Sequence, residues 1–293
     1  MSKVSVIIPT FNNADTICRA IDSCISQSFQ NIEILVVDNG STDKTRELVL
    51  KYTDRRVRYL NSGKPNRSRA RNFGIKQATG KFLQFLDSDD TLKQNKIKHD
   101  VQILDTNSNY WAIADAYEFI SPIFSEVRHI DVNTKKLLGH NIFHTSTVFM
   151  KNDNIKFFNE ELSYCEDWLF WVENFHSKKV IIDNEFIGCT QVVTGTNTMT
   201  NQKKMLEFQM IVRMIIKNKF NVHGLWIIKN DIILMFTFLI CCKKSNMFDK
   251  IINEFYPIYQ LCRFLLIFPI IGKMIRNKVS NVVETNDFVK GKE

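Results

Sequence analysis

The chain has 293 residues, of which 39 are Lys or Arg and 31 are Asp or Glu, so its formal net charge is +8. Residues 1–200 hold 24 basic and 24 acidic side chains, whereas residues 201–293 hold 15 basic and 7 acidic ones. An apolar fraction of 44%, with ten Gly and five Pro, excludes collagen-like, low-complexity and linker-dominated chains. We therefore expect a charge-balanced globular body followed by a basic C-terminal third.

Seven cysteines are scattered along the chain without a CxxC pair or a zinc-type spacing. An odd number of scattered cysteines is unlike the framework of a secreted disulfide-rich protein and favours a reducing compartment. The apolar run Val4–Ile8 is too short for a signal peptide and is typical of a strand. These features predict a cytoplasmic protein.

Strand and helix patterns alternate along the first hundred residues. Short apolar runs predict strands over Val4–Ile8, Ile32–Val37, Val57–Leu60 and Phe82–Leu86. Helix-spaced apolar residues between them predict three helices. The first covers Asp15–Ser26, the second follows the turn Asp38–Asp43 and ends at about Tyr52, and the third covers Ser68–Ala78. This order predicts an α/β fold built from βαβ units, with a mostly parallel sheet that is covered on both faces.

Polar segments follow each of the four predicted strands. They are Pro9–Asn13, Asp38–Asp43, Asn61–Arg71 and Asp87–Asp90. In open α/β sheets, ligands bind beyond the carboxyl ends of the strands. We expect these segments to build the binding site.

After the first hundred residues the pattern of strands and helices is less regular up to residue 200, and beyond residue 200 the pattern is helical. We expect a helix over about Leu92–Leu104, strands near Trp111–Phe119 and Ser146–Met150, and a helix that begins near Glu166. Three further helices are predicted over Lys203–Asn218, Leu225–Cys242 and Asn246–Arg276. The chain thus divides into a main domain, residues 1–200, and a helical, basic, amphipathic extension, residues 201–293.

The extension has no apolar stretch of the length that a membrane span needs. Its longest uncharged runs, Ile232–Cys242 and Phe264–Gly272, fall well short of about 20 residues. Apolar helices with basic flanks suit the interface of an anionic membrane. The alternative is an amphipathic bundle that buries the same apolar surface against the main domain.

Three carboxylates within four residues follow the fourth predicted strand, at Asp87, Asp89 and Asp90. Such groups repel one another unless a cation or hydrogen bonds offset their charge. Mg²⁺ or Mn²⁺, bound by one or two carboxylates and by substrate phosphates, is a suitable partner. The alternative is an acidic turn that caps a helix at Thr91.

Two other segments offer groups for a nucleotide. Asp38 ends the second strand and is placed to accept hydrogen bonds from a base or ribose, while the residues after it cap the next helix. Arg67, Arg69 and Arg71 open a helix on the same edge, which favours an anionic phosphate. The alternative for these arginines is a solvated charged face.

Glu166 and Asp167 lie among aromatic residues such as Tyr164 and Trp168. Acidic residues in a first helical turn are ordinary partners of the helix dipole. A partly desolvated carboxylate in that place could equally accept a proton. Spacing in the sequence favours neither interpretation.

Taken together and in this order, these segments resemble glycosyltransferase family 2, whose members are inverting enzymes with a GT-A fold. The resemblance covers roughly residues 3–200 and is carried by residues 4–13, 26–43, 70–75, 85–90 and 166–168. It implies a Rossmann-like nucleotide-diphospho-sugar transferase, a UDP-sugar donor and Mg²⁺ or Mn²⁺ as cofactor.

The resemblance also implies roles for individual residues. Asp167 would be the catalytic base, and Asp89 of the DXD motif would hold the metal with Asp90 nearby. Further residues would contact the UDP-sugar, namely Pro9, Thr10, Phe11, Asn13, Asp38, Asn39, Arg71, Asp87 and Ser88. Asp38 would face the uracil or ribose, Arg71 the base or diphosphate, and Asp87 the ribose or sugar.

The chain departs from the family pattern in three places. Phe11 stands where members often have Tyr, and Asn39 replaces a frequent second Asp. The stretch Thr194–Thr198 lies where relatives often place a lid near the phosphates, but it lacks their usual Arg or His.

These features predict transfer of a hexose or N-acetylhexosamine to a saccharide hydroxyl. The basic apolar tail indicates a polyprenyl-diphosphate-linked acceptor in bacterial surface-polysaccharide synthesis, with the enzyme peripheral on the inner face of the cell membrane. The alternative is a soluble or polymeric acceptor such as teichoic acid, with the tail used to form a homo-oligomer.

Nucleic acid is not an expected partner. The sequence has no helix-turn-helix, zinc or RNA-binding sheet signature. Its late basic residues alternate with large aliphatic ones, whereas a groove for nucleic acid favours exposed aromatic residues.

Overall fold

The computed structural model describes residues 2–193, 202–222, 224–242, 248–268 and 271–279. These residues form two compact units. The first unit holds residues 2–134, 142–161 and 170–193. The second holds residues 135–141 and 162–169 together with the described residues from 202 onward. Two short segments from the first 200 residues thus group with the C-terminal helices, and the division at residue 200 stays a prediction.

Four parallel strands form one half of the sheet, in the order β3-β2-β1-β4. Their bounds are β1 Val4–Thr10, β2 Ile32–Asp38, β3 Val57–Asn61 and β4 Phe82–Phe85. Val4 of β1 pairs with Ile32 on one side and with Phe82 on the other. The four predicted strands are confirmed to within two residues at each end.

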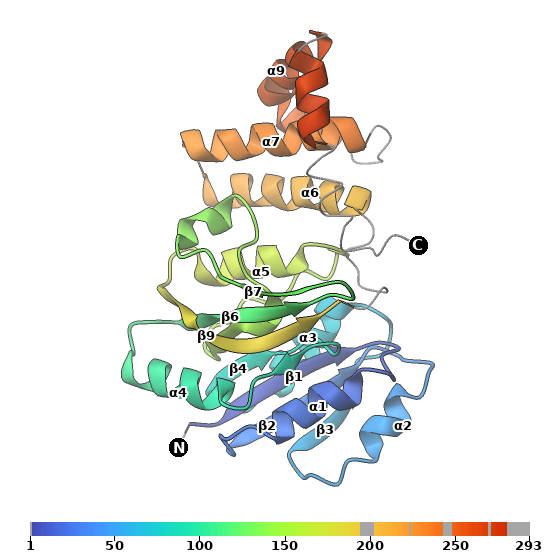
Figure 1. Cartoon of the computed structure of the whole chain (residues 1–293), viewed down its shortest axis with the longest axis vertical. Helices are drawn as coiled ribbons and strands as arrows, with labels where there is room; N and C mark the ends of the chain where they lie inside the picture. The colour runs from blue at the N-terminus through green and yellow to red at the C-terminus, as the bar shows by residue number, and fades with distance from the viewer. Residues whose placement is uncertain (1, 194–201, 223, 243–247, 269–270, 280–293) are drawn as a thin grey trace. The chain divides into compact units, whose positions relative to one another are not determined.

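Helices α1 (Ile17–Ile25), α2 (Thr45–Leu50) and α3 (Arg67–Gln77) cover both faces of these strands, as Figure 1 shows. Helix α1 packs its buried apolar face against the side of the sheet that carries Val6 and Ile8. Helix α3 lies on the opposite face and comes very close to it at Gly74. A Cβ atom at that position would lie 2.5 Å from Cγ2 of Ile7, so no larger residue fits without a shift.

The second half of the sheet continues in the order β4-β8-β6-β9-β5, with β7 paired to β6. Its elements are β5 Thr91–Leu92, α4 Lys96–Thr106, β6 Ala112–Ile120, β7 Ser125–Arg128, η1 Thr134–Leu138, η2 Thr145–Thr147, β8 Val148–Lys151, α5 Glu166–Phe175 and β9 Val180–Val192. Strand β8 is antiparallel to both of its neighbours, whereas β9 runs parallel to β6. The sheet is therefore mixed but mostly parallel, and the predicted fold class is confirmed.

Two local predictions in this half differ from the structure. The helix predicted from Leu92 begins at Lys96, because Thr91 and Leu92 pair with β9 as a short strand. Strand β9 itself was not predicted, since Asp183, Asn184 and Glu185 interrupt its apolar run where the pairing with β6 is irregular. Tertiary pairing decides the structure of both segments.

The second unit is helical. Its helices are α6 Gln202–Phe220, α7 Leu225–Cys241, α8 Phe248–Glu254 and α9 Tyr256–Ile267, followed by a helical segment, Ile271–Val279. The long helix predicted over Asn246–Arg276 is wrong, because the chain starts a new helix at Tyr256. Pro257 lies in the first turn of α9, where its missing N–H costs no hydrogen bond.

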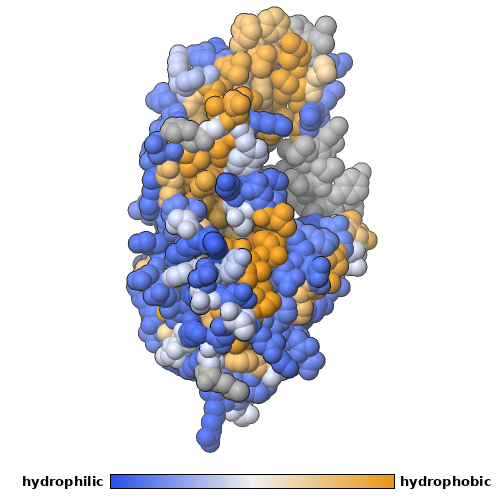
Figure 2. Space-filling view, turned by 90° about the vertical axis from the view of Figure 1, so that its left-hand side faces the viewer, coloured by the Kyte–Doolittle hydropathy of each residue, from blue (hydrophilic) through white to orange (hydrophobic). Residues whose placement is uncertain are grey.

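The helices of this unit share one apolar core, formed around Met210, Met235, Phe238 and Phe255. Figure 2 shows apolar side chains gathered over this part of the molecule. Among the described residues, no single helix combines the length and the apolar content to cross a membrane. Helix α9 and the segment Ile271–Val279, bent by 110° at their break, meet that requirement only when taken as a pair.

Candidate functional site

The parallel strands bring the predicted polar segments to one edge of the sheet. Thr10, at the end of β1, pairs with Asp38, at the end of β2. Leu86, which follows β4, donates its backbone N–H to the carbonyl of Ile7 on β1. Because all three strands run in the same direction, the acidic turn after Leu86 emerges beside the ends of β1 and β2.

Asp90 is the most constrained member of the acidic turn. Its side chain is buried, and its Oδ2 lies 2.6 Å from the Ser146 hydroxyl and 2.7 Å from Nε2 of His144. Its Oδ1 accepts the backbone N–H of Val192, at the end of β9, at 3.3 Å. Burial lowers the pKa of His144, but Asp90 outweighs it, and the net direction is a raised pKa. Three elements that are distant in sequence thus meet at one carboxylate.

Asp87 is paired with the arginine cluster of α3. Nη2 of the buried Arg71 lies 2.9 Å from Oδ1 of Asp87, and its guanidinium lies over the Phe158 ring, 5.2 Å from the centroid. Burial raises the pKa of Asp87, but Arg71 and His144 outweigh it and hold that pKa below its ordinary value. Asp87 is therefore a carboxylate that keeps its charge.

Asp89 behaves in the opposite way. Burial, followed by the charges of Asp90 and Asp87, raises its pKa from 3.8 to about 7. Its backbone carbonyl accepts a hydrogen bond from Nη2 of Arg19 at 2.7 Å. Three carboxylates therefore lie close together in this turn, and a bound cation would interact favourably with them.

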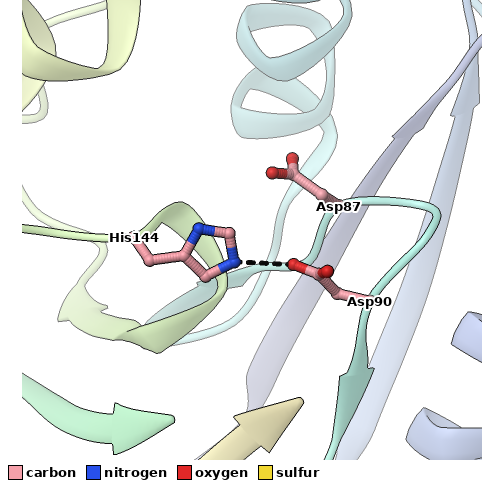
Figure 3. Close-up of side chains that lie close together, drawn as sticks. All are labelled: Asp87, Asp90 and His144. Atoms are coloured by element: carbon pink, nitrogen blue, oxygen red, sulfur yellow. Dashed lines mark hydrogen bonds and ion pairs between the residues drawn. The ribbon is translucent and has the colours of Figure 1, made fainter. Parts of the chain in front are cut away.

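Asp87, Asp90 and His144 form the strand-end cluster, drawn in Figure 3. One ligand atom from each residue lies within 4.8 Å of the other two. The two carboxylate oxygens suit Mn²⁺ or Mg²⁺, whereas the imidazole nitrogen is better matched to a transition metal than to Mg²⁺. Of the two metal ligands predicted from the sequence, Asp90 belongs to this cluster, whereas Asp89 is the neighbour with the raised pKa.

His144 is a member of this cluster that the sequence pattern does not predict. The residue lies just before β8, and β8 runs antiparallel to β4, with Phe149 opposite Gln84. The start of β8 therefore lies beside the end of β4, where the acidic turn begins. A histidine directly before a strand was the available signal, but it points to this site only once the pairing of β4 with β8 is known.

The residues predicted to contact the nucleotide lie at the ends of β1 and β2, and several already have protein partners. Both carboxylate oxygens of Asp38 accept hydrogen bonds, from the Tyr59 hydroxyl and from the Ser41 backbone N–H, each at 2.8 Å. The Asn39 side chain accepts the Ser62 hydroxyl at 3.1 Å. The Asn13 side chain accepts the backbone N–H of Phe11 at 3.1 Å.

The remaining predicted contacts differ in exposure. The ring of Phe11 is 42% exposed, whereas Pro9, Thr10 and Ser88 are buried. Oγ1 of Thr10 has no hydrogen-bond partner among the described residues. An exposed ring beside a buried hydroxyl is compatible with a surface that a nucleotide covers. The predicted lid, Thr194–Thr198, lies outside the described residues.

Asp167 belongs to the first turn of α5, in the part of that helix that groups with the second unit. Its side chain is partly exposed, and its Oδ2 accepts a hydrogen bond from the Asn141 side chain at 2.8 Å. Cys165, two residues earlier, has a φ of +57° and turns the chain into the helix. The predicted base thus lies at an ordered helix start and reaches solvent.

A second cluster of charged residues lies deep in the first unit. Nζ of the fully buried Lys96 contacts Asp100 at 2.5 Å, Asp115 at 2.6 Å and the carbonyl of Thr147 at 2.9 Å. We call Lys96, Asp100 and Asp115 the buried lysine cluster. His99 lies 2.9 Å from Asp100 and, with the two aspartates, has the spacing of a metal site. Lys96 already supplies the positive charge there.

Comparison with known proteins identifies the family of the chain. The family model "Glycosyl transferase family 2" matches residues 5–165. An uncharacterized glycosyltransferase of Rickettsia prowazekii is 31% identical over 221 residues, which cover 70% of this chain and 69% of the relative. The Escherichia coli protein WfaP, a UDP-Glc:alpha-D-GlcNAc-diphosphoundecaprenol beta-1,3-glucosyltransferase, is 28% identical and covers 73% of this chain and 87% of its own.

Solved structures show the same fold. Residues 1–349 of S. aureus TarS in complex with UDP-GlcNAc superpose with a TM-score of 0.64 at 22% identity, over 86% of this chain and 79% of that one. The longer TarS chain is covered over 43% of its length. The Pyrobaculum calidifontis mannosyltransferase PcManGT in complex with GDP-Man and Mn²⁺ gives a TM-score of 0.62 at 15% identity, and the match covers 99% of this chain and 88% of PcManGT. The chain belongs to glycosyl transferase family 2 and has a GT-A fold.

Proposed function

We propose that this glycosyltransferase moves a hexose or N-acetylhexosamine from a UDP-sugar to a hydroxyl of a saccharide carried on polyprenyl diphosphate. The observation that carries the proposal is the strand-end cluster beside Arg71, at the edge where α/β sheets bind ligands. WfaP and a second E. coli relative that is 28% identical, WfgD, support both substrate classes, since both are named as transferring glucose from UDP-Glc to alpha-D-GlcNAc-diphosphoundecaprenol.

Asp87, Asp90 and His144 would hold a divalent cation. The two carboxylates fit Mn²⁺ or Mg²⁺, and Asp89 adds a third carboxylate to the same turn. The complex of PcManGT with GDP-Man and Mn²⁺ supports the same use of metal. When bound, the ion neutralises the diphosphate that leaves with the nucleotide.

Arg71 would act on the leaving diphosphate, and Asp167 would act on the acceptor hydroxyl. Arg71 offers charge-assisted hydrogen bonds to the diphosphate. Asp167 takes the proton of the acceptor hydroxyl, whose oxygen attacks the anomeric carbon while the bond to UDP breaks. Attack from the face opposite the leaving group inverts the configuration, so an α-linked donor gives a β-linked product.

A panel of UDP-sugars with Mn²⁺, scored by thermal shift, tests the donor, because a ligand that binds the native state raises its melting temperature. Transfer from the stabilising donor to GlcNAc-diphospho-undecaprenol, with the product linkage read by NMR, tests the reaction. We expect a β linkage. An α-linked product, or transfer unaffected by a chelator of divalent cations, would contradict the mechanism.

The C-terminal helices would place the enzyme on the inner face of the cell membrane. Phe264, Ile267 and Met274 are each more than half exposed, and Arg263 and Lys273 are exposed beside them. Large apolar side chains interleaved with cations suit the interface of an anionic membrane. The same surface would otherwise serve contact between copies of the chain.

Sedimentation with vesicles that contain an anionic lipid tests this placement. The wild type should pellet with the vesicles, and Phe264→Ser with Ile267→Ser should weaken that binding. Ile123→Ser with Val132→Ser is the matched control, because those side chains are as exposed but lie on the first unit. Wild-type protein that stays in the supernatant as a dimer or larger species would favour the oligomer interpretation instead.

A further inference from the structure

The helix start that carries Asp167 is held by a segment of the chain distant in sequence. Asn141 donates its side-chain N–H to Oδ2 of Asp167 at 2.8 Å. One residue further along α5, the buried indole N–H of Trp168 donates to the carbonyl of Leu137 at 2.6 Å. Two adjacent residues of α5 therefore bind the same segment, residues 135–141, through one side-chain and one backbone contact.

The segment 135–141 is in turn packed closely on α7. A Cβ atom added to Gly139 would lie 2.5 Å from Nδ2 of Asn230 and 2.7 Å from Cη2 of Trp226. The ring of His140 also lies 6.1 Å from the ring of Trp226. Gly139 is thus required here for a close approach of backbone to helix, two residues before Asn141.

Helix α6 contacts two residues that directly precede α5. The ring of Tyr164 lies 5.4 Å from that of Phe208, and Sγ of Cys165 lies 3.4 Å from the sulfur of Met205. These residues, the segment 135–141 and helices α6 and α7 belong to the same compact unit. The turn that carries Asp167 is therefore supported by the C-terminal helices.

We propose that Asn141 is a positioning residue that orients the Asp167 carboxylate, and that α6 and α7 hold the two segments that carry this pair. The inference rests on the proposed role of Asp167 as the base. A carboxylate turns easily about its Cβ–Cγ bond, and a donor fixed to one oxygen restricts that rotation. Loss of orientation lowers the rate of proton transfer while the binding of the nucleotide is unchanged.

The first experiment replaces Asn141 in the full-length protein. Asn141→Leu keeps the approximate volume and removes the donor, and Asn141→Asp places a second carboxylate against the first. With the donor found in the UDP-sugar panel and a short-chain, water-soluble GlcNAc-diphospho-lipid as acceptor, kcat should fall roughly 10- to 100-fold in Asn141→Leu and further in Asn141→Asp. The affinity for UDP with Mn²⁺, measured by calorimetry, should stay within twofold of the wild type.

The second experiment tests the support from α7. Trp226→Ala should lower kcat about 10-fold with the same soluble acceptor, and Trp226→Phe should restore most of it. Leu225→Ala is the matched control, because Leu225 is the adjacent residue of α7 and is 87% exposed. A soluble acceptor separates this effect from any loss of membrane binding.

The outcomes separate the two proposals. If Asp167→Asn abolishes transfer while Asn141→Leu, folded by circular dichroism, keeps kcat within twofold, the base stands and the role of Asn141 is overturned. If Asn141→Leu does not fold, Asn141→Asp decides in the same way. If kcat falls together with the affinity for UDP, Asn141 supports the fold in general and the proposal fails. Near-normal turnover in Asp167→Asn overturns the base and the positioning role together.

Discussion

The strand-end cluster and the buried lysine cluster contain the same kinds of residue, yet they differ in where their positive charge comes from. Lys96 places its ammonium between Asp100 and Asp115. The acidic turn has three carboxylates, with Arg71 beside Asp87 and His144 beside Asp90. Burial, followed by the charges of Asp90 and Asp87, raises the pKa of Asp89. Spacing of His and Asp residues alone would rank both as metal sites.

The difference shows how a structural cluster can be told from a functional one. In the buried lysine cluster a protein group supplies the cation, since Nζ of Lys96 bonds to both aspartates and to the carbonyl of Thr147. Burial, followed by the charge of Asp100, still raises the pKa of Asp115 to about 8, and Oδ1 of Asp115 has no hydrogen-bond partner among the described residues. The strand-end cluster lies instead at the edge of the sheet where α/β folds bind ligands, so its position rather than its charge distinguishes it from the buried lysine cluster.

The largest effect is expected for Asp90→Asn. Removing this charge from the strand-end cluster should lower transfer by more than about 1,000-fold, because the leaving diphosphate loses its cation. The melting temperature of the metal-free protein should fall as well, because the buried Asp90 carboxylate bonds to His144, Ser146 and Val192. Turnover with the donor found in the UDP-sugar panel and thermal melts measure these two effects. Calorimetry measures the binding of Mn²⁺, and a folded variant that binds Mn²⁺ like the wild type would remove Asp90 from the metal site.

Lys96→Met should act on stability instead. Two buried carboxylates lose their counter-ion, so the free energy of unfolding should fall by about 3–5 kcal/mol in urea denaturation, and Mn²⁺ should not restore it. The double variant Lys96→Met with Asp115→Asn should recover part of the loss. A variant that Mn²⁺ stabilises more than the wild type would show that this cluster too can hold a metal.

His144→Ala should weaken the binding of Mn²⁺ roughly 10- to 100-fold, an effect of the size seen when groups that orient metal ligands are lost. His176→Ala is a suitable control, since His176 bonds to the backbone of its own helix, at the Val172 carbonyl. Equal Mn²⁺ affinity in wild type and His144→Ala would leave the histidine with a structural role at Asp90.

The smallest effect is the pH dependence of Asp89. Burial and the neighbouring aspartates raise its pKa to about 7 in the folded state, whereas an unfolded chain has an ordinary pKa near 4. Below pH 4 both states are protonated; as the pH rises to 7 the unfolded state ionises first, so the metal-free protein loses stability and does not regain it above pH 7. Asp89→Asn should therefore stabilise the metal-free protein on the order of 2 kcal/mol at pH 8 and hardly at pH 4. Equal changes at both pH values in thermal melts would contradict this.

The sequence predicts those parts of the molecule whose information is local. Apolar runs that end in polar turns locate β1, β2, β3 and β4, and therefore also Asp87 and Asp90 at the sheet edge. His144 could not be assigned, because its proximity to Asp90 depends on the antiparallel pairing of β8 with β4. Strand β9 could not be predicted for the same reason, because its long-range pairing with β6 continues on both sides of the polar residues that interrupt its apolar run.

The close packing of α3 on the sheet has a consequence for how mutations far from the substrate would act. Gly74 lies three residues after Arg71 and so on the same side of α3, where it contacts Ile7 directly. An alanine there would lever the helix outward and lengthen the 2.9 Å contact between Arg71 and Asp87. Gly74, whose side chain is a single hydrogen atom, thus determines how closely Arg71 approaches Asp87. A survey of mutations that scored distance from the substrate would overlook Gly74.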